Sequence, residues 1–193
     1  MHISEGVLSL PVLVTGWVGT GLGIGISLKK ITVDEIPKMG MLAAVFFVAS
    51  LIHVPLGPTS VHLLLNGLVG IILGILALPT LCIALLLQAI LFQFGGLTTL
   101  GANTLIMGLP AVLAGYLFRL KPNPFWAGIL AGLTVMTSAL CAATALALSG
   151  EQFLNVAKLL VLAHLPVAGI EAVVTFFIIT FILKVKPELI SLK

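Results

Sequence analysis

Long apolar stretches recur along the whole chain, and they constrain its fold more than any other feature. A helix of about 20 apolar residues is long enough to cross roughly 30 Å of hydrocarbon. Only 8% of the 193 residues are Asp, Glu, Lys or Arg, whereas a soluble domain usually carries about 25%. So few charges cannot cover a water-facing surface. The sequence therefore excludes a cytosolic enzyme, an ordinary secreted domain and a disordered protein, and it predicts an all-α polytopic membrane protein.

The spacing of proline, glycine and charged segments predicts a bundle of about seven transmembrane helices. The expected spans are residues 9–28, 39–56, 61–78, 80–95, 105–118, 124–148 and 159–183, with the third and fourth divided at Pro79. We expect residues 1–193 to form a single integral membrane domain. In it, residues 1–8 are an N-terminal segment and residues 9–193 are the helix bundle.

The basic residues predict the orientation of this bundle. With seven spans, an external N-terminus leaves eight basic residues in the cytoplasm and only Lys158 outside. The eight are Lys29, Lys30, Lys38, Arg119, Lys121, Lys184, Lys186 and Lys193. Because cytoplasmic loops are enriched in Lys and Arg, we expect the N-terminus outside and the C-terminus in the cytoplasm. The net charge of +3 reflects this bias rather than a nucleic-acid partner.

Small residues repeat at four-residue spacing in two of the expected spans. Gly19 and Gly23, and Gly21 and Gly25, form such pairs in the first span, and Gly128 and Gly132 form one in the sixth. This spacing lets helix backbones approach closely in lipid. The pairs predict either packing within the bundle or contact with another membrane subunit.

The first two residues carry the most specific chemistry. A free amine at Met1, the amide nitrogen of His2 and the Nδ1 atom of the His2 ring can chelate one ion through a five-membered and a six-membered ring. This planar set of nitrogens suits Ni(II) or Cu(II), and less strictly Co(II), but not tetrahedral Zn(II) or Mg(II). On residue chemistry alone, the alternative is an ordinary solvated N-terminus.

We predict His62 as the fourth ligand. It follows Thr59 and Ser60, either of which can cap the start of the expected third helix, and Asn66 would share its helical face. Such a site also needs hydrogen bonds that fix the imidazole tautomers. The candidates for this role, besides Asn66, are Glu5, Gln88, Thr99 and Asn103. His53 is expected either to join them or to serve the fold alone.

Four segments of the chain together resemble one family of membrane proteins. They are Met1-His-Ile-Ser-Glu-Gly-Val-Leu8, His53-Val-Pro-Leu-Gly-Pro-Thr-Ser-Val-His62, Gln88-Ala-Ile-Leu-Phe-Gln-Phe-Gly-Gly-Leu-Thr-Thr-Leu-Gly-Ala-Asn103 and His164-Leu-Pro-Val-Ala-Gly-Ile-Glu171. In this order they resemble the CbiM/NikM family, the substrate-binding S components of cobalt and nickel energy-coupling-factor (ECF) importers. The segments span nearly the whole chain.

The resemblance implies a seven-helix protein of the prokaryotic inner membrane whose external N-terminus is inserted into the bundle. Met1, His2 and His62 would hold the transported Ni(II) or Co(II), and no cofactor is expected. The implied partners are a membrane coupling subunit (T subunit) and two cytoplasmic ATPases, so the chain itself would not be an enzyme. Many relatives carry a fused auxiliary subunit after the bundle. Because this sequence ends at Lys193, we expect that small membrane subunit to be separate or absent.

A stand-alone proton-coupled transition-metal transporter is the alternative. In it, His164 and Glu171, seven residues apart on one face of the last span, would carry protons. The other interpretation of Glu171 is a buried hydrogen bond that shapes the bundle. The chain contains no HExxH, GxSxG or GxxxxGK[ST] motif, so neither an intramembrane hydrolase nor a P-loop ATPase is predicted.

Overall fold

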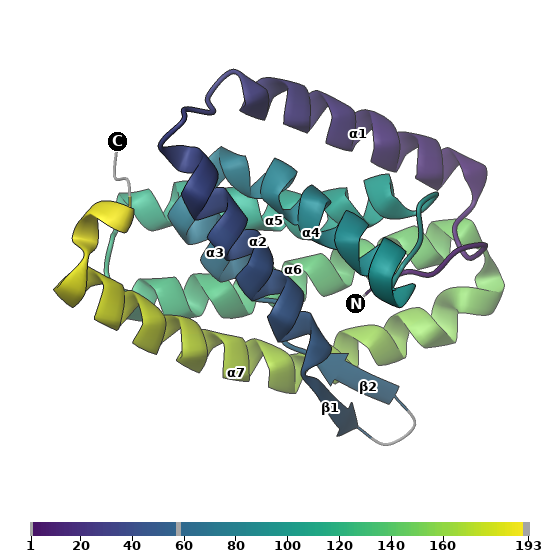
Figure 1. Ribbon diagram of the computed structural model, residues 1–193. Helices are drawn as coiled ribbons and strands as arrows, with labels where there is room; N and C mark the ends of the chain where they lie inside the picture. The colour runs from purple at the N-terminus through teal and green to yellow at the C-terminus, as the bar shows by residue number, and fades with distance from the viewer. Residues whose placement is uncertain (1, 57–58, 191–193) are drawn as a thin grey trace.

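The computed structural model describes residues 2–56 and 59–190, with the backbone alone for residues 53–61. These residues form α1 (Leu10–Leu28), α2 (Glu35–Leu51), β1 (His53–Leu56), β2 (Thr59–His62), α3 (Asn66–Leu73), α4 (Ala77–Phe92), α5 (Leu100–Leu120), α6 (Pro124–Ser149) and α7 (Leu154–Val185). Three short 3₁₀ turns, η1 (Gly74–Leu76), η2 (Glu151–Phe153) and η3 (Pro187–Leu189), complete the order shown in Figure 1.

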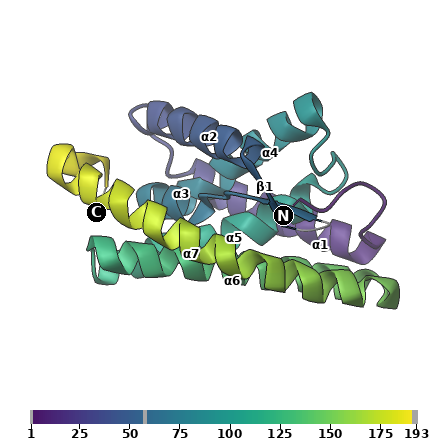
Figure 2. The ribbon, with the colours of Figure 1, turned by 90° about the horizontal axis from the view of Figure 1, so that it is seen from below.

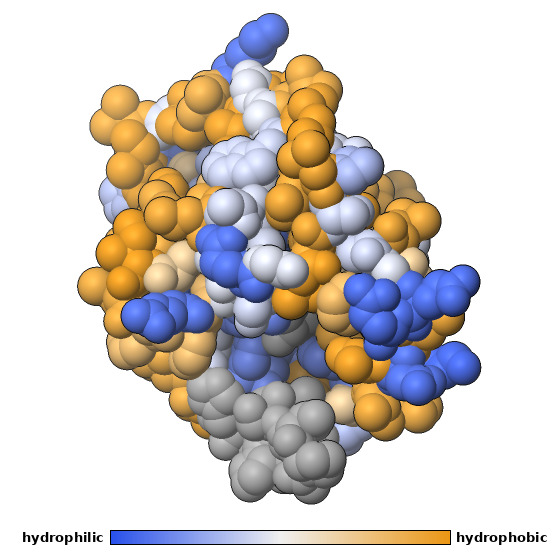
Figure 3. Space-filling model, turned by 90° about the vertical axis from the view of Figure 1, so that its right-hand side faces the viewer, coloured by the Kyte–Doolittle hydropathy of each residue, from blue (hydrophilic) through white to orange (hydrophobic). Residues whose placement is uncertain are grey.

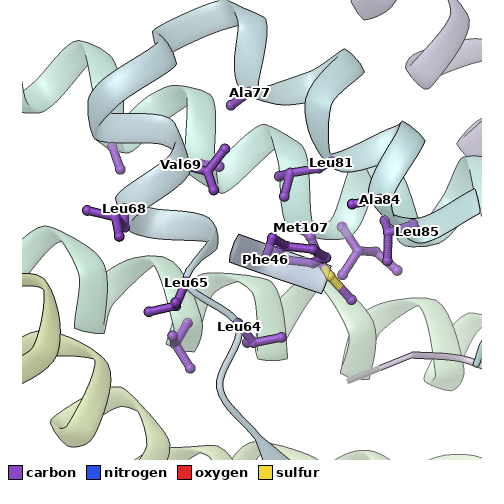
Figure 4. Close-up of a cluster of buried hydrophobic side chains, with 14 of the residues drawn as sticks. Phe46, Leu64, Leu65, Leu68, Val69, Ala77, Leu81, Ala84, Leu85 and Met107 are labelled. Carbon is purple, nitrogen blue, oxygen red and sulfur yellow. The ribbon is translucent and has the colours of Figure 1, made fainter. Parts of the chain in front are cut away.

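Five helical stretches in the described residues are long and apolar enough to cross a membrane. They are Leu10–Leu28, Asn66–Phe92, Leu100–Leu120, Pro124–Ser149 and Glu151–Val185. The predicted class, a helical protein with several membrane spans, is therefore confirmed, whereas a count of seven spans stays a prediction. Between Asn66 and Phe92 the chain also changes direction. It rises through α3, turns next to Ala77 and returns through α4 (Figure 4).

The segment between α2 and α3 is not helical, and here the predicted spans 39–56 and 61–78 are wrong. Strands β1 and β2 pair antiparallel, with His53 opposite His62. Pro55 has no backbone N–H and disfavours the α conformation of the residue before it, so α2 ends at Leu51. Neither Thr59 nor Ser60 therefore caps a helix. Asn66 does not share a helical face with His62 either, because α3 begins only at Asn66.

The predicted division at Pro79 is also wrong, because the chain breaks at Gly74. Gly74 has a φ of +57°, a conformation that glycine adopts without a Cβ clash. Pro79 lies in the first turn of α4, where its missing N–H breaks no intrahelical hydrogen bond. All eight residues of α3 are buried, and at about 1.5 Å per residue the helix is much shorter than the hydrocarbon layer. α3 is thus enclosed by the other helices.

Helix α5 lies at the centre and contacts α1, α3, α4 and α6. Its backbone meets that of α3 directly, because a Cβ at Gly70 would lie 1.8 Å from the Ala111 carbonyl oxygen. Side chains from several elements fill the space beside this contact, among them the buried Phe46, Leu81 and Met107 (Figure 4). α6 and α7 pack along each other on one side of the bundle (Figures 1 and 2).

Of the six repeated glycines in α1 and α6, four meet a neighbour within the bundle. A Cβ at Gly19 or Gly23 would lie within 2.8 Å of a leucine side chain, and one at Gly128 would lie 2.7 Å from the Ala172 carbonyl. Gly132 faces Ala168 more loosely, at 3.0 Å. Gly21, in contrast, has open space around it, as does Gly25.

Candidate metal-binding site

The N-terminal segment folds down onto the end of the bundle and is held there by its backbone. Asn103, in the first turn of α5, accepts a hydrogen bond from Ile3 N–H (3.1 Å) and donates one to the Ile3 carbonyl (3.0 Å). Thr99 donates a second bond to the same carbonyl at 3.0 Å. Ile3 is buried, and Ser9 N–H donates to the Ser149 hydroxyl at the end of α6. The segment is therefore anchored at Ile3 and at Ser9, the residue that follows it.

Glu5 fastens this segment to the loop between α4 and α5. Its carboxylate accepts hydrogen bonds from the backbone N–H (2.9 Å) and the hydroxyl of Thr98. These bonds, the hydroxyl bond first, lower the pKa of Glu5 below its ordinary value. Gly96 allows the close approach, because a Cβ there would lie 2.3 Å from the Glu5 side chain.

The ring of His2, which belongs to this segment, lies against the ring of His62. Their ring centroids are 5.1 Å apart with an interplanar angle of 28°, and Phe94 lies 6.0 Å from the His2 ring. His62 is buried and His2 is half-buried. In Figure 3, which faces this end of the molecule, hydrophilic side chains form several separate patches among hydrophobic ones.

Each of the two rings has one nitrogen engaged by a neighbour. His2 Nε2 lies 2.6 Å from Gln88 Oε1, and His62 Nδ1 lies 3.1 Å from the Leu63 carbonyl oxygen. A carbonyl oxygen can only accept, so the His62 proton is on Nδ1, and in the neutral ring Nε2 has the lone pair. The N-terminal segment therefore brings two imidazoles and a fixed backbone together at one end of the bundle.

The other residues predicted for the site do not all lie near the N-terminal segment. Gln88, Thr99 and Asn103 contact the N-terminal segment, and Glu5, which belongs to that segment, contacts the loop between α4 and α5. Asn66 instead donates to the Met107 carbonyl and the Ser138 hydroxyl, both at 3.0 Å, so its amide joins α3 to α5 and α6. Met1 lies outside the described residues, as does the side chain of His53.

His164 and Glu171 lie on the buried face of α7. His164 Nδ1 donates to the Leu160 carbonyl at 2.7 Å, and among the described residues its Nε2 has no hydrogen-bond partner. Glu171 Oε1 accepts from the backbone N–H groups of Leu64 and Leu65, the latter at 2.8 Å. The carboxylate therefore satisfies the backbone just before α3, which is the hydrogen-bonding role anticipated as one of its two interpretations.

Ser50 and Phe94 contact the predicted residues although the sequence did not single them out. Ser50 is buried and accepts a hydrogen bond from Gln88 Nε2 at 2.6 Å. A polar residue inside an otherwise apolar span was the available signal for Ser50. No comparable signal existed for Phe94, because aromatic residues are ordinary in membrane spans and their ends.

The described residues contain no group of three or more His, Cys, Asp or Glu side chains that could hold a metal ion. Around His2, the described residues bring two imidazoles together, those of His2 and His62.

Comparison with known proteins identifies the family of the chain. Residues 2–189 match the family described as the cobalt uptake substrate-specific transmembrane region, CbiM. The chain belongs to the CbiM family.

Relatives in this family match over almost the whole chain. A protein of Haemophilus influenzae whose name refers to metal transport is 40% identical over 99% of this chain and 97% of its own length. The cobalt transport protein CbiM of Sorangium cellulosum is 33% identical over 99% of this chain and 95% of its own.

The fold is also similar to that of a solved transporter. The crystal structure of a transition metal transporter has a TM-score of 0.84 and 28% identity, and the match covers 96% of this chain and 93% of that one. The predicted resemblance to the CbiM/NikM family is thus confirmed. Names within the family refer to cobalt and to nickel transport.

Proposed function

We propose that this CbiM-family chain is the S component of an ECF-type importer and captures Ni(II) or Co(II) outside the cell. The observation that carries the proposal is the stacked pair His2 and His62, held where the N-terminal segment enters the bundle. Residues 1–8 are the metal-binding segment and residues 9–193 are the bundle that supports it. The transported ion is the cargo of the protein.

The proposed ligands are the Met1 amine, the His2 amide and Nδ1, and His62 Nε2. The bond from His62 Nδ1 to the Leu63 carbonyl supports Nε2 as the ligand atom of that ring. Asn103 supports the backbone contribution, because its two hydrogen bonds to Ile3 fix the chain next to the His2 amide. Four nitrogens favour Ni(II) or Co(II) over oxygen-loving cations such as Mg(II).

Uptake in this proposal is driven from the cytoplasm. The chain lies in the inner membrane of a prokaryotic cell as a multi-pass protein, with the N-terminus outside. A membrane T subunit and two cytoplasmic ATPases couple ATP hydrolysis to release of the ion, and a small auxiliary membrane subunit is a further partner or is absent. The chain is a transport subunit and not itself an ATPase.

The alternative, a stand-alone proton-coupled transporter, needs a proton carrier in α7. The bonds of Glu171 to Leu64 and Leu65 support a structural role for that carboxylate instead. Purified chain in proteoliposomes separates the two functions. Ni(II) uptake driven by a pH gradient alone would contradict the ECF proposal, whereas uptake only with added T subunit, ATPases and ATP would support it.

Blocking the N-terminal amine tests the ligand set. We expect that one extra residue before Met1, or acetylation of the amine, abolishes tight Ni(II) and Co(II) binding in calorimetry, because the five-membered chelate ring loses its amine. Thermal unfolding of the metal-free protein should not change. Unchanged affinity of the blocked protein would remove the amine from the proposed set.

The same titrations distinguish His62 from its partner across the hairpin. We expect His62→Ala to weaken Ni(II) binding by more than the roughly 10- to 100-fold that loss of an outer hydrogen-bonding group costs. His53→Ala is the matched control, because His53 pairs with His62 in the strands and is not a proposed ligand. A larger loss in His53→Ala would assign the fourth ligand to His53.

A further inference from the structure

A buried chain of hydrogen bonds connects α2, through α4, to the His2 ring. The Ser50 hydroxyl of α2 lies 2.7 Å from the Phe47 carbonyl oxygen. Gln88 Nε2 of α4 donates to Ser50 Oγ at 2.6 Å, and Gln88 Oε1 lies 2.6 Å from His2 Nε2. Ser50 and Gln88 are both 0% exposed. Water therefore does not compete for these groups.

The direction of each bond in this chain follows from one carbonyl. The Phe47 oxygen can only accept, so the single hydroxyl proton of Ser50 points toward it. Ser50 Oγ must then accept from Gln88, which turns the Gln88 NH₂ group toward Ser50 and Oε1 toward His2. Because Oε1 also only accepts, the proton of the neutral His2 ring is on Nε2, and Nδ1 has the lone pair.

We propose that Ser50 is a positioning residue which, by orienting the Gln88 amide, selects the His2 tautomer that can bind metal through Nδ1. With the amide turned the other way, its NH₂ group would donate to Nε2 and the ring proton would move to Nδ1. That atom closes the six-membered chelate ring with the His2 amide, so the second tautomer blocks chelation. The metal-binding part of this inference rests on the proposed function, whereas the proton placement does not.

The two histidines of the site are thus fixed in opposite tautomers by different groups. The Leu63 carbonyl holds the proton of His62 on Nδ1, and the pair Ser50 and Gln88 holds that of His2 on Nε2. The ring atoms with lone pairs, His62 Nε2 and His2 Nδ1, are the two that the proposed ligand set requires. Outer hydrogen bonds of this kind fix the orientation and tautomer of metal-binding histidines in general.

The tautomer is measured first in metal-free protein, from the ring ¹⁵N shifts of His2 in detergent. We expect one Nε2–H form in the wild type, and a second, Nδ1–H population in Ser50→Ala and Gln88→Leu. Ser50→Thr keeps the hydroxyl and should restore the single form. Ser27→Ala is the matched control, because Ser27 is also buried in a helix and donates to the Gly23 carbonyl.

Nickel affinity is then measured by calorimetry in the same variants. We expect Gln88→Leu to weaken binding roughly 10- to 100-fold and Ser50→Ala by about 10-fold. Gln88→Glu should recover most of the loss in Gln88→Leu, since a carboxylate oxygen also accepts from Nε2–H. These losses should occur without a fall in thermal stability beyond that of Ser27→Ala.

The inference is overturned by an Nδ1–H form in the wild type, or by wild-type ring shifts in Ser50→Ala. A failure of the proposed function looks different. In that case the wild type has the single Nε2–H form and the variants lose it, but no protein in the series binds Ni(II) or Co(II).

Discussion

At the scale of single residues, Asn103 shows how one side chain fixes a terminal segment. Its amide satisfies both the N–H and the carbonyl of Ile3, so residue 3 is bound as it would be in a strand ladder. A terminal segment is usually poorly ordered unless such bonds tie it down. The buried Ile3 side chain adds an apolar contact to the same point. The position of the His2 backbone therefore depends on α5.

Glu5 gives this attachment a pH dependence. Thr98 lowers the pKa of Glu5, so the stabilisation is present above the ordinary value near 4.5 and is lost as the pH falls through the lowered value. We expect the hydrogen-exchange protection of the Thr98 amide to fall in that acid range. In Glu5→Gln this protection should be weaker and independent of pH. Equal protection of the wild type on both sides of the range would contradict the role of Glu5.

At the scale of elements, α3 begins in an unusual way. Leu65, the residue just before the helix, has a φ of +51°. Its side chain cannot form a capping hydrogen bond to the start of the helix. The carboxylate of Glu171, a residue of α7, acts as the cap instead. It accepts hydrogen bonds from the backbone N–H groups of Leu64 and Leu65. A negative group at this end also interacts favourably with the helix dipole. A short enclosed helix is thereby joined to the longest one.

We expect Glu171→Ala to destabilise the protein strongly. It leaves two buried N–H groups without their acceptor, at a cost of about 1–3 kcal/mol each. Glu171→Gln keeps one carbonyl oxygen that can accept from both groups, so it should be milder. The free energy of unfolding in mixed detergent micelles measures both. Equal stability of Glu171→Ala and the wild type would show that these hydrogen bonds contribute little.

At the scale of the whole molecule, charge is distributed unequally between the two ends. The basic residues that follow α1, α5 and α7 lie at one end, away from the N-terminal segment, whereas Lys158 in the first turns of α7 lies at the other (Figure 1). Because cytoplasmic loops are enriched in Lys and Arg, we expect the proposed metal site to face outward. The ion would thus be captured on the side from which it arrives.

Labelling from outside intact cells tests this orientation. In a background in which Cys82 and Cys141 are replaced by Ala, we expect Leu97→Cys, in the loop beside the site, to react with a membrane-impermeant maleimide. Leu120→Cys, at the opposite end, should react only after the cells are opened. Both leucines are exposed, at 56% and 80%, so accessibility of the side chain itself does not separate them. The reverse pattern would invert the orientation.

Parts of this fold could be predicted from local pattern alone. The first and sixth spans match α1 and α6 within a residue or two because Pro11, Pro124 and Asn123 mark helix starts, and Asn123 does accept from Trp126 N–H. The hairpin and the reversal at Gly74 were missed. Both lie in apolar sequence whose hydropathy is the same for a helix, a buried turn or a strand.

For the candidate site, the residue types were visible in the sequence but their partners were not. Gln88, Thr99 and Asn103 were predicted as hydrogen-bonding residues around the ligands, and each contacts the N-terminal segment. Asn66 was assigned to the same group because a helix was assumed at His62. The ligand set of Met1, His2 and His62 stays a prediction.

The sequence by itself determined the membrane-spanning class, the family and the chelating capacity of the first two residues. Each of these depends on composition, on motifs in order, or on atoms within two neighbouring residues. Only the tertiary structure decided which imidazole lies beside His2 and which nitrogen of the His2 ring has the proton. The physical reason is that these hydrogen bonds join residues far apart in the chain, such as His2 with Gln88 and Leu64 with Glu171. Their direction is set by packing between helices, which no local pattern encodes.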